Sequence, residues 1–226
     1  MDTIADNLQA VKGRIGAAAQ HCGRGADTIE LLAVSKTFGV DAIRSAHAAG
    51  QRAFGENYVQ EAIDKIALLR DLEIIWHFIG PIQSNKTRQI AGHFDWVHGI
   101  DRLKIAERLA SARPASMAPL QVCIQVNIGD ESTKSGVDPA GALALAQSIM
   151  QLPQLELRGL MTIPPASVDT TLQRHHFAQL RELRDSLAAS GIPLDTLSMG
   201  MSADMEAAIA EGATLVRIGT AIFGSR

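Results

Sequence analysis

The sequence predicts an α/β protein whose eight parallel strands close into a (β/α)8 barrel of the TIM type. Short apolar runs alternate with amphipathic stretches along the whole chain, and 46% of the 226 residues are hydrophobic, enough for a large buried core. Strands that alternate with helices form parallel sheets with right-handed crossovers, and eight such units close naturally into a barrel. We expect residues 1–226 to form one domain.

Eight short apolar runs give the predicted strands. They are residues 31–35, 52–55, 74–79, 94–98, 122–127, 157–161, 196–199 and 215–218. Segments with apolar residues at three- and four-residue spacing give the predicted helices between them. These are residues 40–49, 59–69, 83–91, 103–112, 140–151, 172–189 and 205–210. A further helix, over about residues 3–20, is expected outside the barrel.

An open, doubly wound parallel sheet is the alternative architecture. Such a sheet usually carries a glycine-rich GxGxxG turn after its first strand. The turn after the first predicted strand reads SKTFG here and lacks that pattern. The barrel is therefore favoured.

Composition excludes several classes of function. A net charge of −3 gives no general attraction for nucleic acid or for an anionic membrane. The chain has no run of eighteen apolar residues that would predict a membrane span, and its polar N-terminus does not look like a signal peptide. Cys22 and Cys123 are far apart and form no metal-spaced pair. We expect no metal site and a reducing, cytoplasmic location.

Lys36 is the first candidate functional residue, because it directly follows the strand at residues 31–35. The C-terminal ends of the strands form the functional face of such barrels. A lysine placed there is desolvated and near other cations, and both effects lower its pKa and free the amine for imine chemistry. A surface lysine just beyond a strand end is the alternative interpretation.

The ends of the last two strands predict a phosphate site. Gly219 and Thr220 open the segment after the eighth strand, where backbone N–H groups and a hydroxyl can hold an anion. Ser198 and Ser202 lie on the neighbouring seventh strand and its loop, and Gly200 between them allows close approach of the backbone. In the alternative interpretation Ser202 only caps the following helix. A lysine beside a phosphate site suits either a phosphosugar aldolase or a holder of pyridoxal 5′-phosphate (PLP).

Together, many segments resemble the pyridoxal phosphate homeostasis proteins, in order from about residue 30 to the end. The segments are LLAVSKT (31–37), FGENYVQE (54–61), WHFIGPIQSNK (76–86), FDWVHGID (94–101), GDESTKSG (129–136), RGLM (158–161), LSMGMSADMEAAI (197–209) and VRIGTAIFG (216–224). The resemblance implies a barrel like the N-terminal domain of alanine racemase, without that enzyme's second domain.

The resemblance also implies roles for individual residues. Lys36 corresponds to the family lysine that forms a Schiff base with PLP, and Arg217 to the arginine that faces its pyridine nitrogen. The family's phosphate contacts correspond to Ser202, Gly219 and Thr220. Asn57 corresponds to a residue at the mouth of the cofactor site, and Lys134 to a second lysine implied to accept or pass on the cofactor.

The sequence argues against efficient catalysis, and no catalytic residue is assigned. An arginine is always charged, so the ring nitrogen beside Arg217 stays unprotonated and the cofactor is a poor electron sink. Racemases of this type add a tyrosine from a second domain, and nothing places Tyr58 in that role. The family pattern often has Lys-Pro after SKT, whereas this chain has Phe38-Gly39; any help that lysine gives to cofactor transfer is missing.

We therefore expect a protein of vitamin B6 homeostasis that holds PLP on Lys36 and is not an enzyme. A weak PLP-dependent amino-acid racemase is the alternative function, and the phosphosugar aldolase remains a third hypothesis. The expected partners are PLP and apo-enzymes that receive it, with no nucleic acid and no membrane. We expect a monomer.

Overall fold

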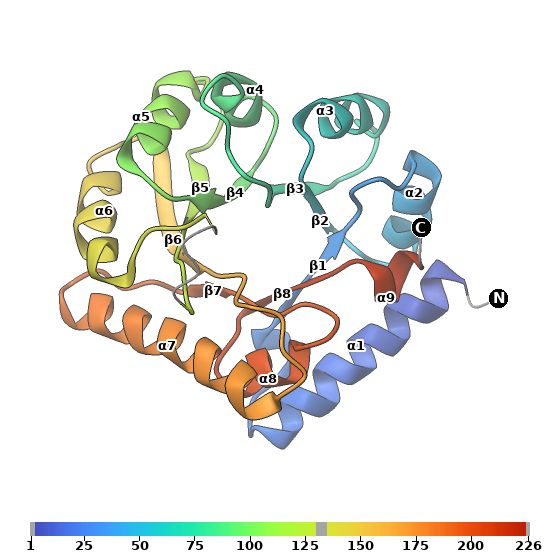
Figure 1. Cartoon of the computed structure of the whole chain (residues 1–226). Coiled ribbons are helices and arrows are strands. Elements are labelled where there is room, and N and C mark those ends of the chain that lie inside the picture. Colours follow the sequence, from blue (N-terminus) through green and yellow to red (C-terminus); the bar gives the residue numbers. More distant parts are fainter. Residues whose placement is uncertain (1–2, 130–134, 225–226) are drawn as a thin grey trace.

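The computed structural model describes residues 3–129 and 135–224. Its eight strands are all parallel and are hydrogen-bonded in chain order, with β1 also paired to β8, so that the sheet closes into a barrel (Figure 1). This confirms the predicted fold. The strands are β1 (Glu30–Val34), β2 (Ala53–Glu56), β3 (Ile75–Phe78), β4 (Trp96–Ile100), β5 (Leu120–Gln125), β6 (Leu155–Met161), β7 (Thr196–Ser198) and β8 (Leu215–Ile218).

Helices form the outer layer around the barrel (Figure 1). They are α1 (Ile4–His21), α2 (Val40–Ala48), α3 (Val59–Leu68), α4 (Thr87–Ala91), α5 (Leu103–Ala112), α6 (Ala142–Ile149), α7 (Thr170–Ala189), α8 (Met205–Ala210) and α9 (Thr220–Phe223), with 3-10 turns at Ala26–Thr28 and Pro139–Gly141. None of the helices formed by the described residues combines the length and apolar character that crossing a bilayer demands.

Two predicted helices are shorter in the structure. The segment predicted as a helix over residues 83–91 is helical only in α4, because Ser84 and Lys86 take part in a turn: Lys86 N donates to Gln83 O at 2.9 Å and Thr87 Oγ1 donates to Ser84 O at 3.0 Å. The segment predicted over 140–151 is helical in α6, after the 3-10 turn that begins at Pro139.

Strand residues alternate between the helix-facing core and the barrel interior, as the period of two in a β-strand requires. On β1, Leu31 and Ala33 belong to the main core beneath the helices, whereas Leu32 packs inside the barrel with Ala53 and Leu215. A second interior cluster consists of Trp96, Cys123 and Met161. The interior is therefore filled with side chains.

Helix α1 lies across the outside of the barrel and joins the two ends of the chain. It packs against α2, α8 and α9. Asn7 Nδ2 donates to Ile222 O at 3.0 Å, and Arg24, just beyond α1, donates to the carbonyl oxygens of Ile209 and Ala213 at 2.9 and 2.8 Å. Figure 1 shows α1 beside α8 and α9. This helix therefore braces the last two βα units.

We expect Leu8→Ala to lower the free energy of unfolding by about 2–5 kcal/mol, the usual cost of truncating a buried leucine. Leu8 has no exposed surface and faces the core from α1. Urea denaturation followed by circular dichroism measures the change. Leu68→Ala is the control: Leu68 is 63% exposed, and we expect a change within about 0.5 kcal/mol. Equal effects of the two substitutions would show that α1 is not docked as described.

Candidate functional site

A cavity of about 310 Å³ opens at the C-terminal ends of the strands. All six residues that the sequence assigned to cofactor binding line it: Lys36, Asn57, Ser202, Arg217, Gly219 and Thr220. Sequence reasoning did not find the other lining residues, which are Val34, Phe38, Ile79, Ile163, Met201 and Ala203. Segments at the ends of β1, β2, β3, β6, β7 and β8 thus meet around one space.

Lys36 sits in a tight turn at the end of β1. Phe38 N donates to Ser35 O at 3.1 Å, which closes the turn around the lysine. Thr37 has φ +67°, a conformation that β-branched residues rarely adopt and that costs about 1–3 kcal/mol. Thr37 N donates to Glu61 Oε1 at 2.6 Å. The side chain of Glu61, on α3, therefore holds the strained residue next to Lys36.

A buried ion network under this turn fixes it further. Lys65 Nζ contacts Glu56 Oε1 at 2.7 Å, Glu61 Oε1 at 2.5 Å and the carbonyl oxygen of Ser35 at 2.9 Å. Ser35 Oγ also donates to Glu56 Oε1, at 2.7 Å. The side chains of Lys65 and Glu56 are 7% and 0% exposed. One ammonium group thus links α3 and the end of β2 to the turn that carries Lys36.

The network holds two carboxylates for one ammonium group. Burial raises the pKa of Glu56, and the hydrogen bond and charge of Lys65 oppose that rise. Glu56 Oε2 is buried and has no hydrogen-bond partner among the described residues. The ionised state of Glu56 therefore depends on Lys65. The i, i+4 spacing of Glu61 and Lys65 in the sequence was the signal that could have revealed part of this network.

Arg217 forms the inner wall of the cavity. It is 4% exposed, and burial lowers its pKa to about 10, so the guanidinium remains protonated at neutral pH. Its Nη1 donates to Ser198 O at 2.6 Å and to Ser198 Oγ at 2.7 Å, and its Nη2 donates to Thr162 O at 2.8 Å. A guanidinium carries five N–H donors, so two are not used by Ser198 or Thr162.

Ser202, Gly219 and Thr220 form a polar side of the cavity. The chain reaches Ser202 through Gly200, which has φ +94° and lies so close to α8 that an added Cβ would stand 2.6 Å from Ala208 Cβ. The alternative role of Ser202 as a helix cap is wrong: the residue before α8 is Asp204, whose Oδ1 accepts from Met201 N at 2.6 Å. Ser202 therefore lines the cavity and does not cap α8.

Asn57 enters the cavity from the end of β2. Gly80 packs directly against its backbone, since a Cβ at Gly80 would lie 2.5 Å from Asn57 O. Asn57 Oδ1 is buried and receives no hydrogen bond from the described residues. A buried acceptor in this state favours a ligand that brings an O–H or N–H donor.

Tyr58 does not line this cavity and is 54% exposed. The remaining sequence candidate, Lys134, falls outside the described residues. Of the described residues that line the cavity, only Lys36 and Arg217 have titratable side chains. The cavity therefore combines one amine, one fixed cation, hydroxyl and amide groups, and apolar walls.

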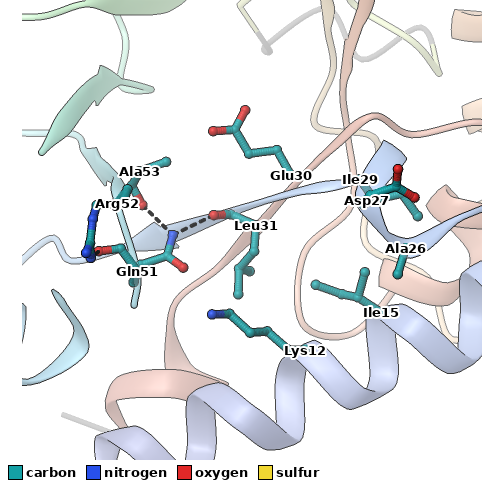
Figure 2. A pocket seen from close by; sticks show the side chains of 10 residues that line it. All are labelled: Lys12, Ile15, Ala26, Asp27, Ile29, Glu30, Leu31, Gln51, Arg52 and Ala53. Atoms are coloured by element: carbon teal, nitrogen blue, oxygen red, sulfur yellow. Dashed lines mark hydrogen bonds between the residues drawn. The ribbon is translucent and has the colours of Figure 1, made fainter. Parts of the chain in front are cut away.

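A second cavity, of about 440 Å³, lies near the N-terminal end of β1, between α1 and the starts of β1 and β2 (Figure 2). Its polar groups tie the strands together: Gln51 Nε2 donates to Leu31 O at 2.6 Å and to Ala53 O at 2.8 Å. Arg52 Nη1 donates to the carbonyl oxygens of His47 and Gln51. This end of such barrels contributes to stability, so we place the candidate site at the opposite end.

Comparisons with known proteins agree in family and in fold. A family model described as alanine racemase, N-terminal domain, matches residues 6–226. A pyridoxal phosphate homeostasis protein of Pseudomonas aeruginosa is 59% identical over 226 residues, covering 100% of this chain and 97% of that protein. The solved structure of PipY from Synechococcus elongatus with PLP bound is 40% identical, with a TM-score of 0.86, and covers 98% of this chain and 100% of that one.

Alanine racemase of Clostridium difficile is a more distant structural relative. It is 14% identical with a TM-score of 0.76, covering 98% of this chain and 57% of that one. Identity at this level shows a shared fold alone.

We expect Lys65→Met to lower the free energy of unfolding by about 3–5 kcal/mol at neutral pH, because it leaves the buried carboxylate of Glu56 without its positively charged partner. Without Lys65, burial raises the pKa of Glu56 further above its unfolded value, so the folded variant binds the extra proton and gains stability as the pH falls. The difference in the free energy of unfolding between wild type and variant is therefore expected to become smaller as the pH falls. Urea titrations at several pH values measure it.

Two controls separate this network from general effects. Lys104→Met removes an exposed lysine on α5 and is expected to change stability little at any pH. Glu56→Gln in the Lys65→Met background is expected to restore part of the lost stability, because it removes the buried charge. A Lys65→Met variant as stable as wild type at neutral pH would contradict the account.

Proposed function

Because this chain belongs to the family of pyridoxal phosphate homeostasis proteins, we propose that it binds PLP as a Schiff base on Lys36 and takes part in the homeostasis of that cofactor. The observation that carries the proposal is the convergence of Lys36, Arg217 and the segment around Ser202, Gly219 and Thr220 on one cavity. The PipY structure, with PLP bound, covers nearly the whole of this chain.

The chemistry of the cavity walls fits such a cofactor. A flat aromatic ring needs apolar walls, which Val34, Ile79 and Ile163 supply. An anionic phosphate group is stabilised by hydroxyl and backbone N–H donors, which Ser202, Gly219 and Thr220 offer at the ends of β7 and β8. Small-molecule sites usually combine apolar walls with a few polar groups in this way.

Lys36 supplies the covalent bond. Its neutral amine attacks the aldehyde carbon, a C=N bond replaces the C=O bond, and the oxygen leaves as water with two protons taken from the amine. The turn from Ser35 to Phe38 and the Lys65 network fix the backbone from which the amine extends. PLP supplies the aldehyde, and in enzymes it also serves as an electron sink.

The residues of this cavity fit a protein that holds the cofactor better than they fit an enzyme that turns over amino acids with it. Racemisation needs a second acid–base group at the amino-acid Cα, and Lys36 and Arg217 are the titratable residues among the described lining. Arg217 keeps its proton at neutral pH and does not act as a base. Tyr58 is largely exposed. Weak racemase activity is the alternative that an assay must test.

The wider proposal is that the chain works as one barrel domain and as a monomer in the cytoplasm, passing PLP to apo-enzymes. Cys22 and Cys123 are both free thiols, as suits a reducing compartment. Burial raises the pKa of Cys123 to about 12, so this thiol is inert.

We expect Lys36→Ala to abolish the yellow absorption of the protein loaded with PLP while leaving the fold intact. Borohydride reduction of wild type followed by peptide mass spectrometry is expected to place the label on Lys36. Lys104→Ala, at an exposed lysine on α5, is the matched control and is expected to keep the full band. A full band in Lys36→Ala, with the label on another lysine such as Lys134, would move the attachment site.

We expect the loaded protein to turn over amino acids no faster than free PLP. A positioned acid or base usually contributes about 10²–10⁴-fold to rate, and the described lining offers no second one. α-Proton exchange in D₂O and chiral chromatography over a panel of L-amino acids measure the rate. A turnover above roughly 1 s⁻¹, within the usual range for enzymes, that is lost in Lys36→Ala would make the protein an enzyme.

A further inference from the structure

A chain of hydrogen bonds crosses the barrel interior behind the cavity. It joins His77 on β3, His98 on β4, Ser198 on β7 and Arg217 on β8, and these four side chains are between 0% and 4% exposed. Arg217 Nη1 lies 2.7 Å from Ser198 Oγ, Ser198 Oγ lies 2.8 Å from His98 Nδ1, and His98 Nε2 lies 3.0 Å from His77 Nδ1.

Arg217 favours one direction for every bond in this chain. A guanidinium only donates, so Ser198 Oγ accepts from Arg217 and its own hydroxyl proton is free to go to His98 Nδ1. His98 Nδ1 is then an acceptor, and the ring carries its proton on Nε2, which donates to His77 Nδ1. His77 in turn carries its proton on Nε2. In this arrangement both imidazoles are Nε2–H tautomers.

The opposite arrangement leaves more groups unsatisfied. If His98 carried its proton on Nδ1, Ser198 Oγ would accept from both neighbours and its hydroxyl proton would have no acceptor among the described residues. In the first arrangement, among these four side chains, only the N–H group at His77 Nε2 is left without a hydrogen-bond partner in the described part of the structure. Buried polar groups are satisfied wherever the geometry permits, which favours the first arrangement.

Neither imidazole takes up a second proton at neutral pH. Burial lowers the pKa of His77 to about 3. Burial is also the main cause that holds the pKa of His98 well below its usual value, followed by electrostatic interactions with His77 and Arg217. The His77 ring stacks on Trp96, with centroids 5.4 Å apart and planes 7° from parallel. The end of the chain is therefore held by stacking, and Arg217 remains its one charged member.

We propose that His98 is a positioning residue that sets the orientation of the Arg217 guanidinium through Ser198, in a one-way chain of hydrogen bonds completed by His77. Without an acceptor at His98 Nδ1, nothing holds the Ser198 side chain in the rotamer whose Oγ accepts from Arg217 Nη1. The guanidinium, which lines the cavity, then keeps the carbonyl oxygens of Ser198 and Thr162 as acceptors but loses the Ser198 hydroxyl, so its orientation is less tightly set.

The tautomers can be tested without any cofactor. ¹⁵N NMR of histidine side chains in the full chain free of PLP is expected to show His77 and His98 as neutral rings with a bare Nδ1 and a protonated Nε2. His98→Gln and His98→Leu assign the signals. A protonated Nδ1 on either ring would overturn the proposed direction of the chain.

The effect on Arg217 is tested in the loaded protein, and this arm rests on the proposed function. His98→Gln keeps an acceptor toward Ser198 and a donor toward His77, so we expect its absorption spectrum to match wild type. His98→Leu keeps neither, and we expect a shifted band. His93→Leu, at an exposed histidine beside α4, is the control and is expected to match wild type.

Ser198→Ala removes the link between His98 and Arg217 with little change in volume. If His98→Leu does not fold, this variant tests whether the chain of hydrogen bonds positions Arg217. We expect the same shift in Ser198→Ala. Equal shifts in His98→Gln and His98→Leu, or an unshifted band in Ser198→Ala, would overturn the positioning role. If wild type binds no PLP, the proposed function fails, and the NMR experiment alone then decides this inference.

Discussion

The pairing of β1 with β8 closes the barrel and places the first and the last strand side by side at the site. Leu32 lies opposite Arg217 and Ala33 opposite Ile218 in this pair. Because parallel strands end at the same edge, the turn that carries Lys36 and the segment from Gly219 follow each other around the rim. No local stretch of sequence contains the cavity; it exists because the first and last strands are hydrogen-bonded.

Two buried hydrogen-bond networks then hold Lys36 and Arg217 in place. On the β2–α3 side, Lys65 and its carboxylates hold the backbone under Lys36. On the β7–β8 side, Ser198 and the carbonyl of Thr162 hold the guanidinium of Arg217. Polar networks of this kind are costly when incomplete and rigid when satisfied. The backbone under Lys36 and the guanidinium of Arg217 are thereby both fixed by buried partners.

The sequence predicted all eight strands, because strand ends in a barrel can be read from apolar runs and the polar residues that follow them. That reading also pointed to Lys36, Ser202, Gly219 and Thr220, whereas Asn57 and Arg217 were assigned through the family resemblance. It did not reveal the network of Lys65, since a lysine in a predicted helix is usually expected to face solvent. Only the packing of α3 against the barrel shows that Lys65 is buried beside Glu56. It predicted His77 inside a strand, but its pairing with His98 depends on strand register. The apolar lining, such as Phe38 against Phe223, is equally non-local.

Helix α1 has a consequence for the way the protein is made. Its apolar face, formed by Leu8, Val11, Ile15 and Ala19, is covered largely by α8 and α9. The ribosome synthesises the helix first and these partners last, so at about 5–20 residues per second the face waits roughly 10–40 s for its cover. During that time the apolar face of this amphipathic helix is exposed on the nascent chain. A molecular chaperone that binds apolar surfaces could therefore bind this helix before the barrel closes.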